Sequence, residues 1–547
     1  MNAMAWPWLS AAEPHPDLSG YRPVLGEKGM VSSPHAGASM IGAEILRQGG
    51  NAVDAAIATS AALMVLLPMQ CGLGGDAFWL IASSGEIKAL DASGRSPSGA
   101  NADDLHALGH ASVPARSAFS VTVPGAVSGW IEAHSALGTR PLADLLRPAA
   151  DLAETGYFLS RHGLASFLAA ETELRATDAL SLWSEDGTLP RLYQRIRQPR
   201  LAQALRIIAE SHGENFYRGR IADAIADCVA ARGGWLKRAD LAAHAAEWVE
   251  PIKADFRGHD VYTTPASTQG FALLAALTRL ASVRERPISN TSAEDIHVLV
   301  EAVGASLQDR DAFNDDRSRI GPGFEKIWSK ERVGAFSRMF NPAMRSAYSA
   351  EPGNRTTKGD TAHLAIVDRD GMAVSLIQSL FFDFGSAIPV APVGFTLQNR
   401  GAAFHLDEEA PGALAGGIRP PSTLMPSIVM RGGTPLLTFG CMGGDGQVQT
   451  QLQLLVDIID AQLDVQQAVS KPRWYLDRSA EGECRLMMEQ GFSAEIVSEL
   501  SSRGHRVEQL SRWEEIMGHA QAIAVTAEKV MIGGADPRSD GQVAAVQ

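Results

Sequence analysis

The sequence predicts an α+β protein, with helices through most of its first part and strands gathered after residue 360. Between about Arg140 and Asp311 apolar residues recur at helical spacing, as in PLADLLRPAADLAETG (141–156) and RIADAIADCVAARGG (220–234). From Thr361 onward the chain changes to short apolar runs bounded by turn residues, which is typical of strands. With 45% hydrophobic and 20% charged residues, the 547-residue chain has enough apolar side chains for a sizeable core.

Two buried helices are expected between Gly37 and Leu67, because this stretch is apolar nearly all round and is broken only at Gly49-Gly50. Asn51 is placed to cap the second helix. The run CGLGGDAFWLIA (71–82) then predicts a Gly-rich turn entering a strand, and EIKALDASG (86–94) predicts its partner. Asp54 lies inside the second helix, so a structural hydrogen-bond network is expected for its carboxylate, and not catalysis.

The middle of the chain ends in a segment that is expected to be an exposed linker. Before it, VYTTPASTQGFALLAAL (261–277) predicts a strand, a turn and a helix, and Asp309 and Arg310 are expected to form structural salt bridges. The linker, from Ser346 to Asp360, lacks apolar periodicity and is rich in polar and turn residues. It should therefore be accessible.

After the linker, TAHLAIVDRDGMAVSLIQSL (361–380) predicts two strands joined at Asp370-Gly371, a favourable hairpin dipeptide. Strands are also expected for MPSIVMR (425–431) and PLLTFG (435–440), on either side of Gly432-Gly433. A helix is predicted for TQLQLLVDIIDAQL (450–463), followed by another strand pair near the C-terminus.

Charge and cysteine usage exclude several function classes. The formal charge of -14, without a basic stripe, excludes nucleic-acid binding. The four cysteines are far apart and never in C-x-x-C spacing, so neither a zinc site nor a disulfide framework is expected: Cys71, Cys228, Cys441 and Cys484. Cys441 is interpreted as a packing residue. Because no Gly-rich run has phosphate-loop spacing, neither a cofactor nor a metal is expected.

The beginning of the sequence has no basic region followed by an apolar run, and about 18 uninterrupted apolar residues occur nowhere. We therefore expect a cytoplasmic protein that does not contact a membrane.

Thr361 is the candidate catalytic nucleophile. An amide is inert until a nucleophile attacks its carbonyl, and a threonine hydroxyl needs a base to remove its proton. A threonine at a chain terminus carries its own base, because a free α-amine has a pKa of about 7.7 to 8.0. A cut between Asp360 and Thr361 would create that terminus, and the Thr361 hydroxyl can itself attack the Asp360 carbonyl. Alternatively, Thr361 only begins a strand, as threonine often does. His363 should point to the same side of that strand, with a hydrogen-bonded structural role.

Several motifs, in this order, resemble the γ-glutamyltranspeptidase family, and the resemblance runs from about Gly29 to Gln547. The motifs are QGGNAVDAAIATSAAL (48–63), CGLGGDAF (71–78), TVPGAVSGW (122–130), GDTAHLAIVDRDGMAV (359–374), GIRPPSTLMPSIV (417–429), TFGCMGGDGQ (438–447) and ADPRSDG (535–541). The resemblance implies a four-layer αββα sandwich of the N-terminal-nucleophile (Ntn) hydrolase type. It also implies one precursor that cleaves itself into a large subunit, 1–360, and a small subunit, 361–547, which stay together as one globular body.

The resemblance also implies roles for individual residues. Thr361 falls on the family's nucleophile, and Ser379 falls where the family usually has a threonine that bonds the nucleophile; serine keeps the donor and the acceptor. Ser422 and Thr423 fall on the family's paired hydroxyl residues beside the scissile carbonyl. Gly443 and Gly444 fall on the family's glycine pair, whose backbone N–H groups make the oxyanion hole. Glycines without Cβ let backbone N–H groups approach a ligand closely. Taken alone, the first pair is a loop or cap and the second a turn.

The specificity pocket departs from the family. Where γ-glutamyl enzymes have an arginine, an aspartate, an asparagine and a glutamine, this chain has Ser93, Ala403, Phe381 and Arg400. An ammonium group needs an acceptor, and Ala403 supplies none. Arg400, and Arg95 two residues after Ser93, are instead predicted to bind a substrate carboxylate. The pocket therefore favours an anion without an amino group.

The predicted function is autoprocessing followed by hydrolysis of a small carboxylate-bearing amide such as oxamate. The M-G-G-D-G-Q run (442–447) resembles the oxamate amidohydrolase branch of the family. The expected partners are the small-molecule amide and the two subunits of one precursor, and homo-oligomer formation stays open. The alternatives are γ-glutamyl hydrolysis or transfer on glutathione or γ-glutamyl peptides, acylase activity on β-lactam side chains, and an unprocessed, non-catalytic relative.

Overall fold

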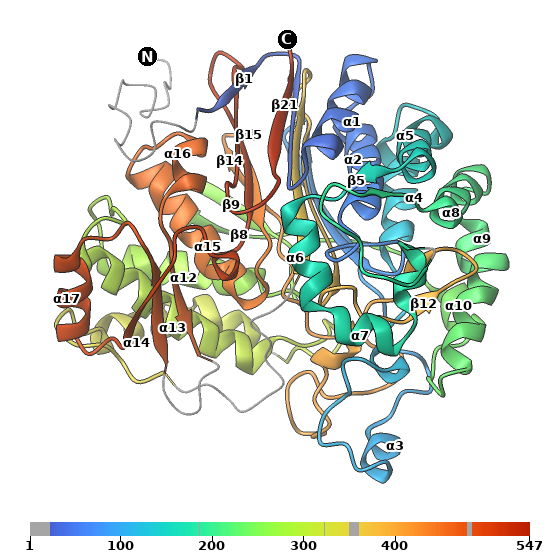
Figure 1. The fold of residues 1–547 in the computed structure, drawn as a ribbon. Coiled ribbons are helices and arrows are strands. Elements are labelled where there is room, and N and C mark those ends of the chain that lie inside the picture. Colours follow the sequence, from blue (N-terminus) through green and yellow to red (C-terminus); the bar gives the residue numbers. More distant parts are fainter. Residues whose placement is uncertain (1–21, 185, 322, 349–359, 479–483) are drawn as a thin grey trace.

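A computed structural model of the chain describes residues 22–184, 186–321, 323–348, 360–478 and 484–547 (Figure 1). Its centre consists of two seven-stranded antiparallel sheets. The first has the order β1 (Val24–Gly26), β20 (Met531–Ala535), β19 (Ala520–Val525), β15 (Thr434–Cys441), β14 (Ser427–Arg431), β9 (His259–Thr263) and β8 (Ile252–Phe256). The second has the order β21 (Gln542–Val546), β2 (Gly29–Ser33), β10 (Asp360–Asp368), β11 (Ala373–Phe381), β3 (Asp76–Ser83), β4 (Glu86–Ala92) and β7 (Glu247–Val249).

Helices cover the outer face of each sheet. Over the second sheet lie α1 (Ala36–Arg47), α2 (Ala52–Leu66), α4 (Ala126–Leu137), α5 (Leu142–Thr155) and α8 (Pro199–Glu210), with α3 (Ala102–Ala107), α6 (Arg161–Ala169), α7 (Glu171–Ala176), α9 (Glu214–Tyr217), α10 (Arg220–Ala230) and α11 (Arg238–Ala243) farther out. Over the first sheet lie α12 (Gly270–Val283), α15 (Gln447–Leu455) and α16 (Val465–Ser470), followed by α13 (Ala293–Phe313), α14 (Lys330–Met339) and α17 (Ala494–Ser502).

Three smaller sheets complete the fold: β16 (Trp474–Asp477) with β17 (Arg485–Glu489) and β18 (Val507–Leu510), β5 (Tyr157–Phe158) with β6 (Arg195–Ile196), and β12 (Pro389–Val390) with β13 (Phe395–Thr396). The layer order is thus helices, sheet, sheet, helices, which confirms the predicted α+β sandwich.

The nine residues of β10 are all buried, because the strand has an apolar layer on each side. Ala362, Leu364 and Ile366 face the core beneath α1 and α2. Ala365 and Val367 belong to the core between the two sheets. Burial on both faces is the reason that the strand shows no alternation of polar and apolar residues. The strand is held from both sides in the middle of the molecule.

The predicted helix pair is confirmed, with α1 ending at Arg47 and α2 starting at Ala52. Asn51 caps α2 by accepting a hydrogen bond from the Asp54 N–H at 2.9 Å, and the Asp54 carboxylate accepts one from the Asn51 N–H at 3.1 Å. Asp54 also accepts hydrogen bonds from the backbone and the hydroxyl of Thr139. This is the structural network that was expected for it.

Other expectations need correction. The stretch between 140 and 311 contains, besides its helices and β9, which overlaps the strand predicted at the start of 261–277, the strands β7 and β8 at sheet edges, which were not expected. The C-terminal part adds α17 and the β16–β18 sheet to the expected strand pair. Most of the predicted linker, residues 349–359, and the beginning of the chain, residues 1–21, lie outside the described residues.

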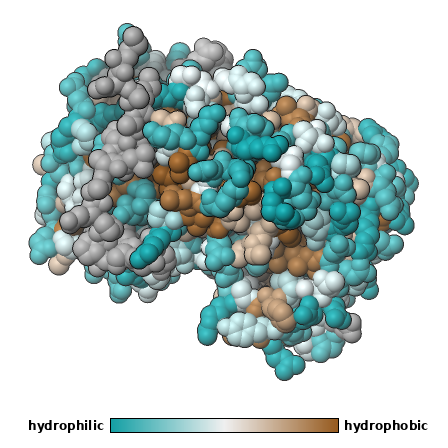
Figure 2. All heavy atoms as spheres, turned by 90° about the horizontal axis from the view of Figure 1, so that it is seen from above, coloured by the Kyte–Doolittle hydropathy of each residue, from teal (hydrophilic) through white to brown (hydrophobic). Residues whose placement is uncertain are grey.

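Among the described residues, no helix combines the length and the apolar character that crossing a lipid bilayer requires. Figure 2 shows a surface of mainly hydrophilic side chains with hydrophobic residues gathered in a few patches.

Candidate active site

Asp360 and Thr361 begin β10, and Ser379 lies near the end of β11. The strands are antiparallel neighbours, so the start of one lies beside the end of the other, and their pairing shifts register between Asp360 and Ala362. Thr361 Oγ1 donates a hydrogen bond to Ser379 Oγ at 3.3 Å. Both side chains are 1% exposed. The hairpin alone therefore brings the predicted nucleophile and its hydroxyl partner together.

The Ser379 hydroxyl has all its hydrogen-bonding positions occupied. It donates to the Asp360 carbonyl oxygen at 2.7 Å, and it accepts from the Phe381 N–H at 2.8 Å and from Thr361. A hydroxyl has one donor and two acceptor positions, so each proton has a defined direction. The Thr361 proton points to Ser379, and the Ser379 proton points to the carbonyl of the Asp360–Thr361 bond. Because β10 runs unbroken through that bond, this is the geometry of the uncleaved chain.

His363 connects the two sheets. Its Nε2 lies 2.8 Å from Ser375 Oγ, which donates to the Phe439 carbonyl at 3.0 Å, so the imidazole is the donor to Ser375. Burial lowers the pKa of His363 to about 3, which keeps the ring neutral. A neutral, hydrogen-bonded ring between the sheets agrees with the structural role expected for it.

The glycine pair follows the strand that passes over His363. A Cβ on Gly440 would lie 2.5 Å from the His363 ring, and the chain then continues past the end of β15 to Gly443 and Gly444. Their φ angles are +128° and +52°, in the region that favours glycine. Within the described part of the chain, no partner is found for either N–H group. Two free backbone donors are what an oxyanion hole requires.

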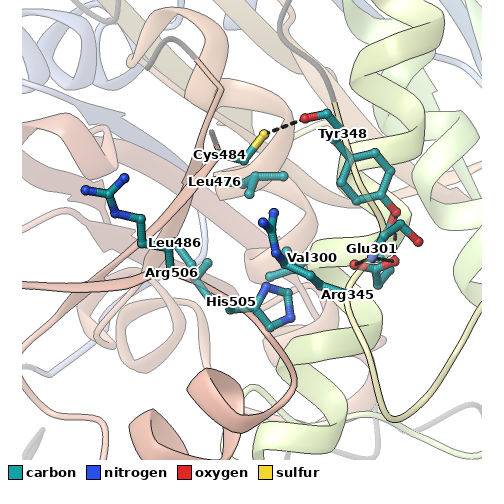
Figure 3. A pocket seen from close by; sticks show the side chains of 10 residues that line it. Val300, Glu301, Arg345, Tyr348, Leu476, Cys484, Leu486, His505 and Arg506 are labelled. Carbon is teal, nitrogen blue, oxygen red and sulfur yellow. Dashed lines mark hydrogen bonds between the residues drawn. The ribbon is translucent and has the colours of Figure 1, made fainter. Parts of the chain in front are cut away.

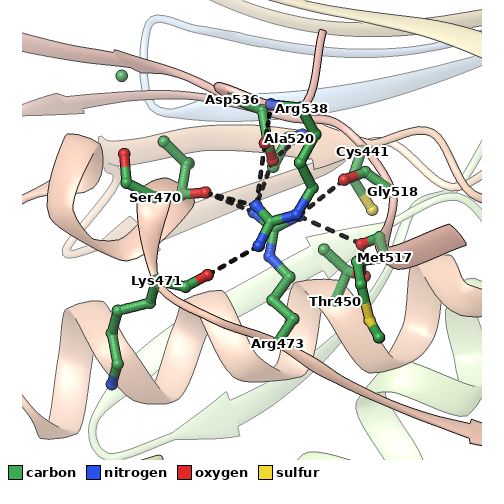
Figure 4. Close-up of polar contacts among 12 residues, drawn as sticks. Cys441, Thr450, Ser470, Lys471, Arg473, Met517, Gly518, Ala520, Asp536 and Arg538 are labelled. Carbon is green, nitrogen blue, oxygen red and sulfur yellow. Dashed lines mark hydrogen bonds and ion pairs between the residues drawn. The ribbon is translucent and has the colours of Figure 1, made fainter. Parts of the chain in front are cut away.

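Arg473 and Asp536 form a buried ion pair near this loop (Figure 4). Arg473 pairs with Asp536 at 2.7 Å and donates to the Gly518 carbonyl at 2.8 Å. Gly518 packs against the loop, because a Cβ on Gly443 would lie 3.2 Å from its Cα. The neighbouring Met442 N–H donates to the backbone of residue 519 at 3.0 Å. Because Arg473 and Asp536 are both almost fully buried, this support is rigid.

Gln269 joins the glycine loop to the second predicted pair. Its Nε2 donates to the Thr423 carbonyl at 2.8 Å and to the Gly444 carbonyl at 2.9 Å. Its Oε1 accepts from Arg310 at 3.1 Å, and Arg310 also pairs with Asp445 at 2.7 Å. The salt bridge expected for Arg310 is thus confirmed, and it holds the loop that carries the glycine pair.

Ser422 precedes Thr423 and is 2% exposed. Its N–H donates to the Ser267 carbonyl at 2.8 Å, and its Oγ accepts from the Leu424 N–H at 3.2 Å. The Ser422 hydroxyl therefore keeps its own proton available for a further acceptor. The expected structural bridges of Asp309 are also confirmed, with Arg279 and Arg332 as partners.

Arg400 is a buried cation with unused donors. It is 1% exposed, and none of its Nε, Nη1 and Nη2 atoms has a hydrogen-bond partner among the described residues. Asp76 Oδ2, which also lacks a hydrogen bond, lies 3.7 Å from Nε. The guanidinium carbon lies 4.4 Å from the centre of the Phe381 ring. A guanidinium in this state has donors available to an anion.

The Arg400 pair belongs to the same site as the hydroxyls, because Asp76 on β3 is paired in register with Ser379 on β11. Asp76 Oδ1 accepts from Gln398 at 2.9 Å and from the Gly94 N–H at 2.8 Å, which leaves Oδ2 for Arg400. Burial raises the pKa of Asp76 to about 6, although the positive charge of Arg400 opposes the shift. Burial likewise lowers the pKa of Arg400 to about 10.

Arg95 lies in a different environment. Its Nη2 pairs with Glu247 at 2.8 Å, and its Nη1 lies 3.6 Å from Asp316 and 3.3 Å from the Gly417 carbonyl. Both ends of its guanidinium are thus engaged, and 37% of its side chain is exposed. The structure does not bring Arg95 into contact with the Thr361 hydroxyl pair.

One group of potential metal ligands lies elsewhere, and two of its members, Glu301 and His505, are labelled in Figure 3. Ligand atoms of His297, Glu301 and His505 lie within 4.8 Å of one another. The two histidines are hydrogen-bonded to each other at 2.8 Å, and Glu301 accepts from the Tyr348 hydroxyl at 2.9 Å. Arg345 lines the same pocket and would repel a cation. The cluster instead anchors Tyr348, which directly precedes residues 349–359.

The sequence interpretation missed Asp76, Gln269 and also Asp383, whose carboxyl is hydrogen-bonded to that of Asp360. Asp76 is the only charged residue of the buried run CGLGGDAFWLIA, which is the signal that could have drawn attention to it. Gln269 and Asp383 carry no such signal, because their partners lie far away in the sequence.

Comparisons with known proteins find relatives along almost the whole chain. The model of the family described as Gamma-glutamyltranspeptidase matches residues 38–546. The glutathione hydrolase-like YwrD proenzyme of Bacillus subtilis (strain 168) is 38% identical over 528 residues, which cover 95% of this chain and 98% of that protein. The oxamate amidohydrolase proenzyme of Klebsiella pneumoniae is 35% identical over 528 residues, which cover 94% and 98%.

A solved structure shows the same architecture. The crystal structure of cephalosporin acylase from Bacillus halodurans has a TM-score of 0.90 and 33% identity to this chain, and the match covers 100% of this chain and 99% of that one.

Proposed function

The chain belongs to the gamma-glutamyltranspeptidase family of N-terminal-nucleophile hydrolases, which act on amide bonds, and from this premise we propose that it is a self-processed threonine amidohydrolase for a small carboxylate-bearing amide such as oxamate. Membership of the family confirms the resemblance inferred from the motifs. Both relatives named above are proenzymes, which supports processing of this chain as well. A cut after Asp360 divides the 547 residues into a large subunit of 360 residues and a small subunit of 187.

In the mature enzyme, the freed Thr361 amine takes the Thr361 hydroxyl proton, and Oγ1 attacks the substrate carbonyl. The N–H groups of Gly443 and Gly444 stabilise the oxyanion. The Ser422 and Thr423 hydroxyls bind beside the scissile carbonyl. Collapse of the intermediate expels the amine product and leaves an acyl-enzyme. Water, activated by the same amine, then releases the acid and restores Thr361.

The observation that carries the choice of substrate is the buried Arg400 guanidinium, whose three nitrogens lack a hydrogen bond among the described residues and whose ion-pair contact, with Asp76, is 3.7 Å long. Leaving such a group without an acceptor costs several kcal/mol, and a substrate carboxylate satisfies it in bidentate fashion. Ala403 offers no acceptor for an ammonium group. Because both ends of the Arg95 guanidinium already have partners, we assign carboxylate binding to Arg400 and an outer, supporting role to Arg95.

A second candidate is γ-glutamyl hydrolysis, and one observation favours it. Asp76 Oδ2 has no hydrogen-bond donor and lies beside Arg400, so the two together could hold a zwitterionic head group. The relative with 38% identity is named as glutathione hydrolase-like. Against this stands Ala403, which supplies no acceptor where γ-glutamyl enzymes have an aspartate.

The test is a comparison of oxamate, glutathione and a γ-glutamyl anilide as substrates of purified, processed enzyme, together with the Asp76→Asn variant. Our proposal expects turnover of oxamate by both enzymes. If only the γ-glutamyl substrates are cleaved, and Asp76→Asn abolishes their cleavage, the zwitterion clamp is correct and our choice of substrate is wrong. The Thr361→Ala variant should remain a single, inactive chain on a denaturing gel; cleavage of that variant would contradict self-processing.

A further inference from the structure

The side chain of Asp360 lies against the bond that processing must break. Asp360 Oδ1 accepts a hydrogen bond from the Thr361 N–H at 3.1 Å, and Asp360 is only 4% exposed. When this bond breaks, the Thr361 nitrogen has to receive a proton, because an amide anion is too basic to leave. The carboxyl of Asp360 is the acidic group in hydrogen-bond contact with that nitrogen.

Asp360 has the acid form that such a transfer needs. Burial raises the pKa of the Asp360 carboxyl well above its usual range, and the charge of Asp383 and a hydrogen bond with Asp383 raise it further. The charge of Glu515 acts in the same direction. Cys71, which also faces Asp360, is kept as a neutral thiol because burial raises its pKa. The charges that shift the pKa of Asp360 most strongly are therefore negative.

Asp383 is itself held in place. It follows β11, and Arg116 Nη1 donates to its backbone carbonyl at 2.7 Å. The two carboxyls come from different strand ends, so the pair forms only when the hairpin and the following loop have folded. A proton shared between two carboxyls is a familiar way to keep one of them protonated near neutral pH.

We propose that the Asp360 carboxyl is the acid that protonates the Thr361 nitrogen during self-cleavage, and that Asp383 is a positioning residue that keeps the proton on Asp360. This rests on the proposed function, because it assumes that Thr361 attacks the preceding carbonyl. It adds a catalytic residue for processing, distinct from the residues that turn over the substrate.

The steps balance as follows. Thr361 Oγ1 bonds to the Asp360 carbonyl carbon while its proton passes to Ser379 Oγ and the Ser379 proton passes to the carbonyl oxygen. The C–N bond then breaks, and the Asp360 carboxyl gives its proton to the Thr361 nitrogen. The hydroxyl proton of the intermediate returns through Ser379 to the Asp360 carboxylate as the carbonyl re-forms. The product is an ester with a free amine, and water hydrolyses the ester to the Asp360 α-carboxylate and the Thr361 hydroxyl.

The test is the rate of processing in full-length precursor made by cell-free translation, followed on denaturing gels after transfer to buffers from about pH 5 to about pH 9. In the wild type, the rate should fall as the pH rises through the raised pKa of Asp360, because the acid form is lost. Asp360→Asn keeps the shape of the side chain but lacks the acidic proton, and it should slow processing by about 100-fold or more and remove this pH dependence.

The Asp383→Asn variant tests whether Asp383 acts through the pKa of Asp360, because a purely structural role of Asp383 would not shift the pH profile of processing. Loss of the neighbouring negative charge lowers the pKa of Asp360, so the fall in rate should begin at a lower pH than in the wild type. Asp370→Asn is the matched control, because the Asp370 side chain is 84% exposed in the turn after β10. Its pH profile should equal that of the wild type.

Two results would overturn the inference: processing of Asp360→Asn at the wild-type rate, or an unchanged pH profile in Asp383→Asn. Thermal unfolding of the precursors, compared with Thr361→Ala, identifies a variant that has merely lost its fold. Cleavage of Thr361→Ala would instead contradict the proposed function itself, so the two failures are distinguishable.

Discussion

Replacing Arg400 with glutamine is the most direct test of how this enzyme selects its substrate. Glutamine retains a polar head of moderate size but removes the charge and the planar pair of donors. The change also removes the positive charge 3.7 Å from Asp76, so the pKa of Asp76, already about 6, should rise further and its carboxyl should become neutral. The variant is thus not left with an isolated buried anion.

The size of the effect follows from the burial of the site. Truncating one partner of a buried, hydrogen-bonded charge pair costs about 2–5 kcal/mol, and Arg400 is 1% exposed. At about 1.4 kcal/mol per factor of ten, kcat/KM for oxamate should fall by roughly 30- to 4,000-fold. Because the carboxylate contact exists both before and during the reaction, most of the loss should appear as a higher KM.

The assay is release of ammonia from oxamate, with Arg95→Gln as the matched variant. Arg95 already has Glu247 and Asp316 as partners, so its replacement should change KM by less than about tenfold. A gel that shows complete processing of both variants verifies that only substrate binding is compared. If Arg95→Gln loses oxamate turnover and Arg400→Gln keeps it, our assignment of the carboxylate site is wrong.

Three further predictions concern the same site. First, KM for an anionic amide should fall as the pH falls through about 6, because protonation of Asp76 frees the Arg400 guanidinium beside it. The Asp76→Asn variant should lose this pH dependence. A wild-type KM that does not change with pH would count against the ion pair. Second, Arg473→Met removes one of the two arginines that pair with the buried Asp536 and leaves Arg538 as its partner, so it should lower the free energy of unfolding by about 1.5–3 kcal/mol, as measured by denaturant titration with a wild-type control. Third, Gly443→Ala places a Cβ 3.2 Å from the Gly518 Cα at a residue whose φ is +128°. This change should lower kcat by about 100-fold or more with little change in KM. An equally large loss of binding in a separate binding assay would indicate that the variant is misfolded.

Much of the fold could be predicted from local patterns. The apolar character of the sequence and the Gly49-Gly50 break predict the α1–α2 pair. The Asp370-Gly371 dipeptide predicts the β10–β11 hairpin. The edge strands β7 and β8 could not be separated from the helical sequence around them, because edge strands are short and have few apolar residues, whereas β9 overlaps the strand predicted at the start of 261–277. The identity of β7 depends on its pairing with β4, which lies far away in the sequence.

The candidate site divides in the same way. Thr361 and Ser379 are close in sequence and belong to one hairpin, so their contact follows from the turn between them. The difference between Arg95 and Arg400 could not be seen, since both are single arginines in polar surroundings of the sequence. What separates them is the partners that the fold supplies: Glu247 and Asp316 engage Arg95, whereas Arg400 has no hydrogen-bond partner in the described part of the chain and lies 3.7 Å from Asp76.

Phe381 shows why nucleophile and specificity residues are coupled here. Its φ of +82° is unfavourable for a bulky side chain and costs on the order of 1–3 kcal/mol. This turned backbone directs the Phe381 N–H to Ser379 Oγ at 2.8 Å and places the ring 4.4 Å from the Arg400 guanidinium carbon. A residue with an ordinary φ would lose one contact or the other. The strain is therefore retained because a single position orients the hydroxyl partner of Thr361 and also supports the cation that we assign to substrate binding.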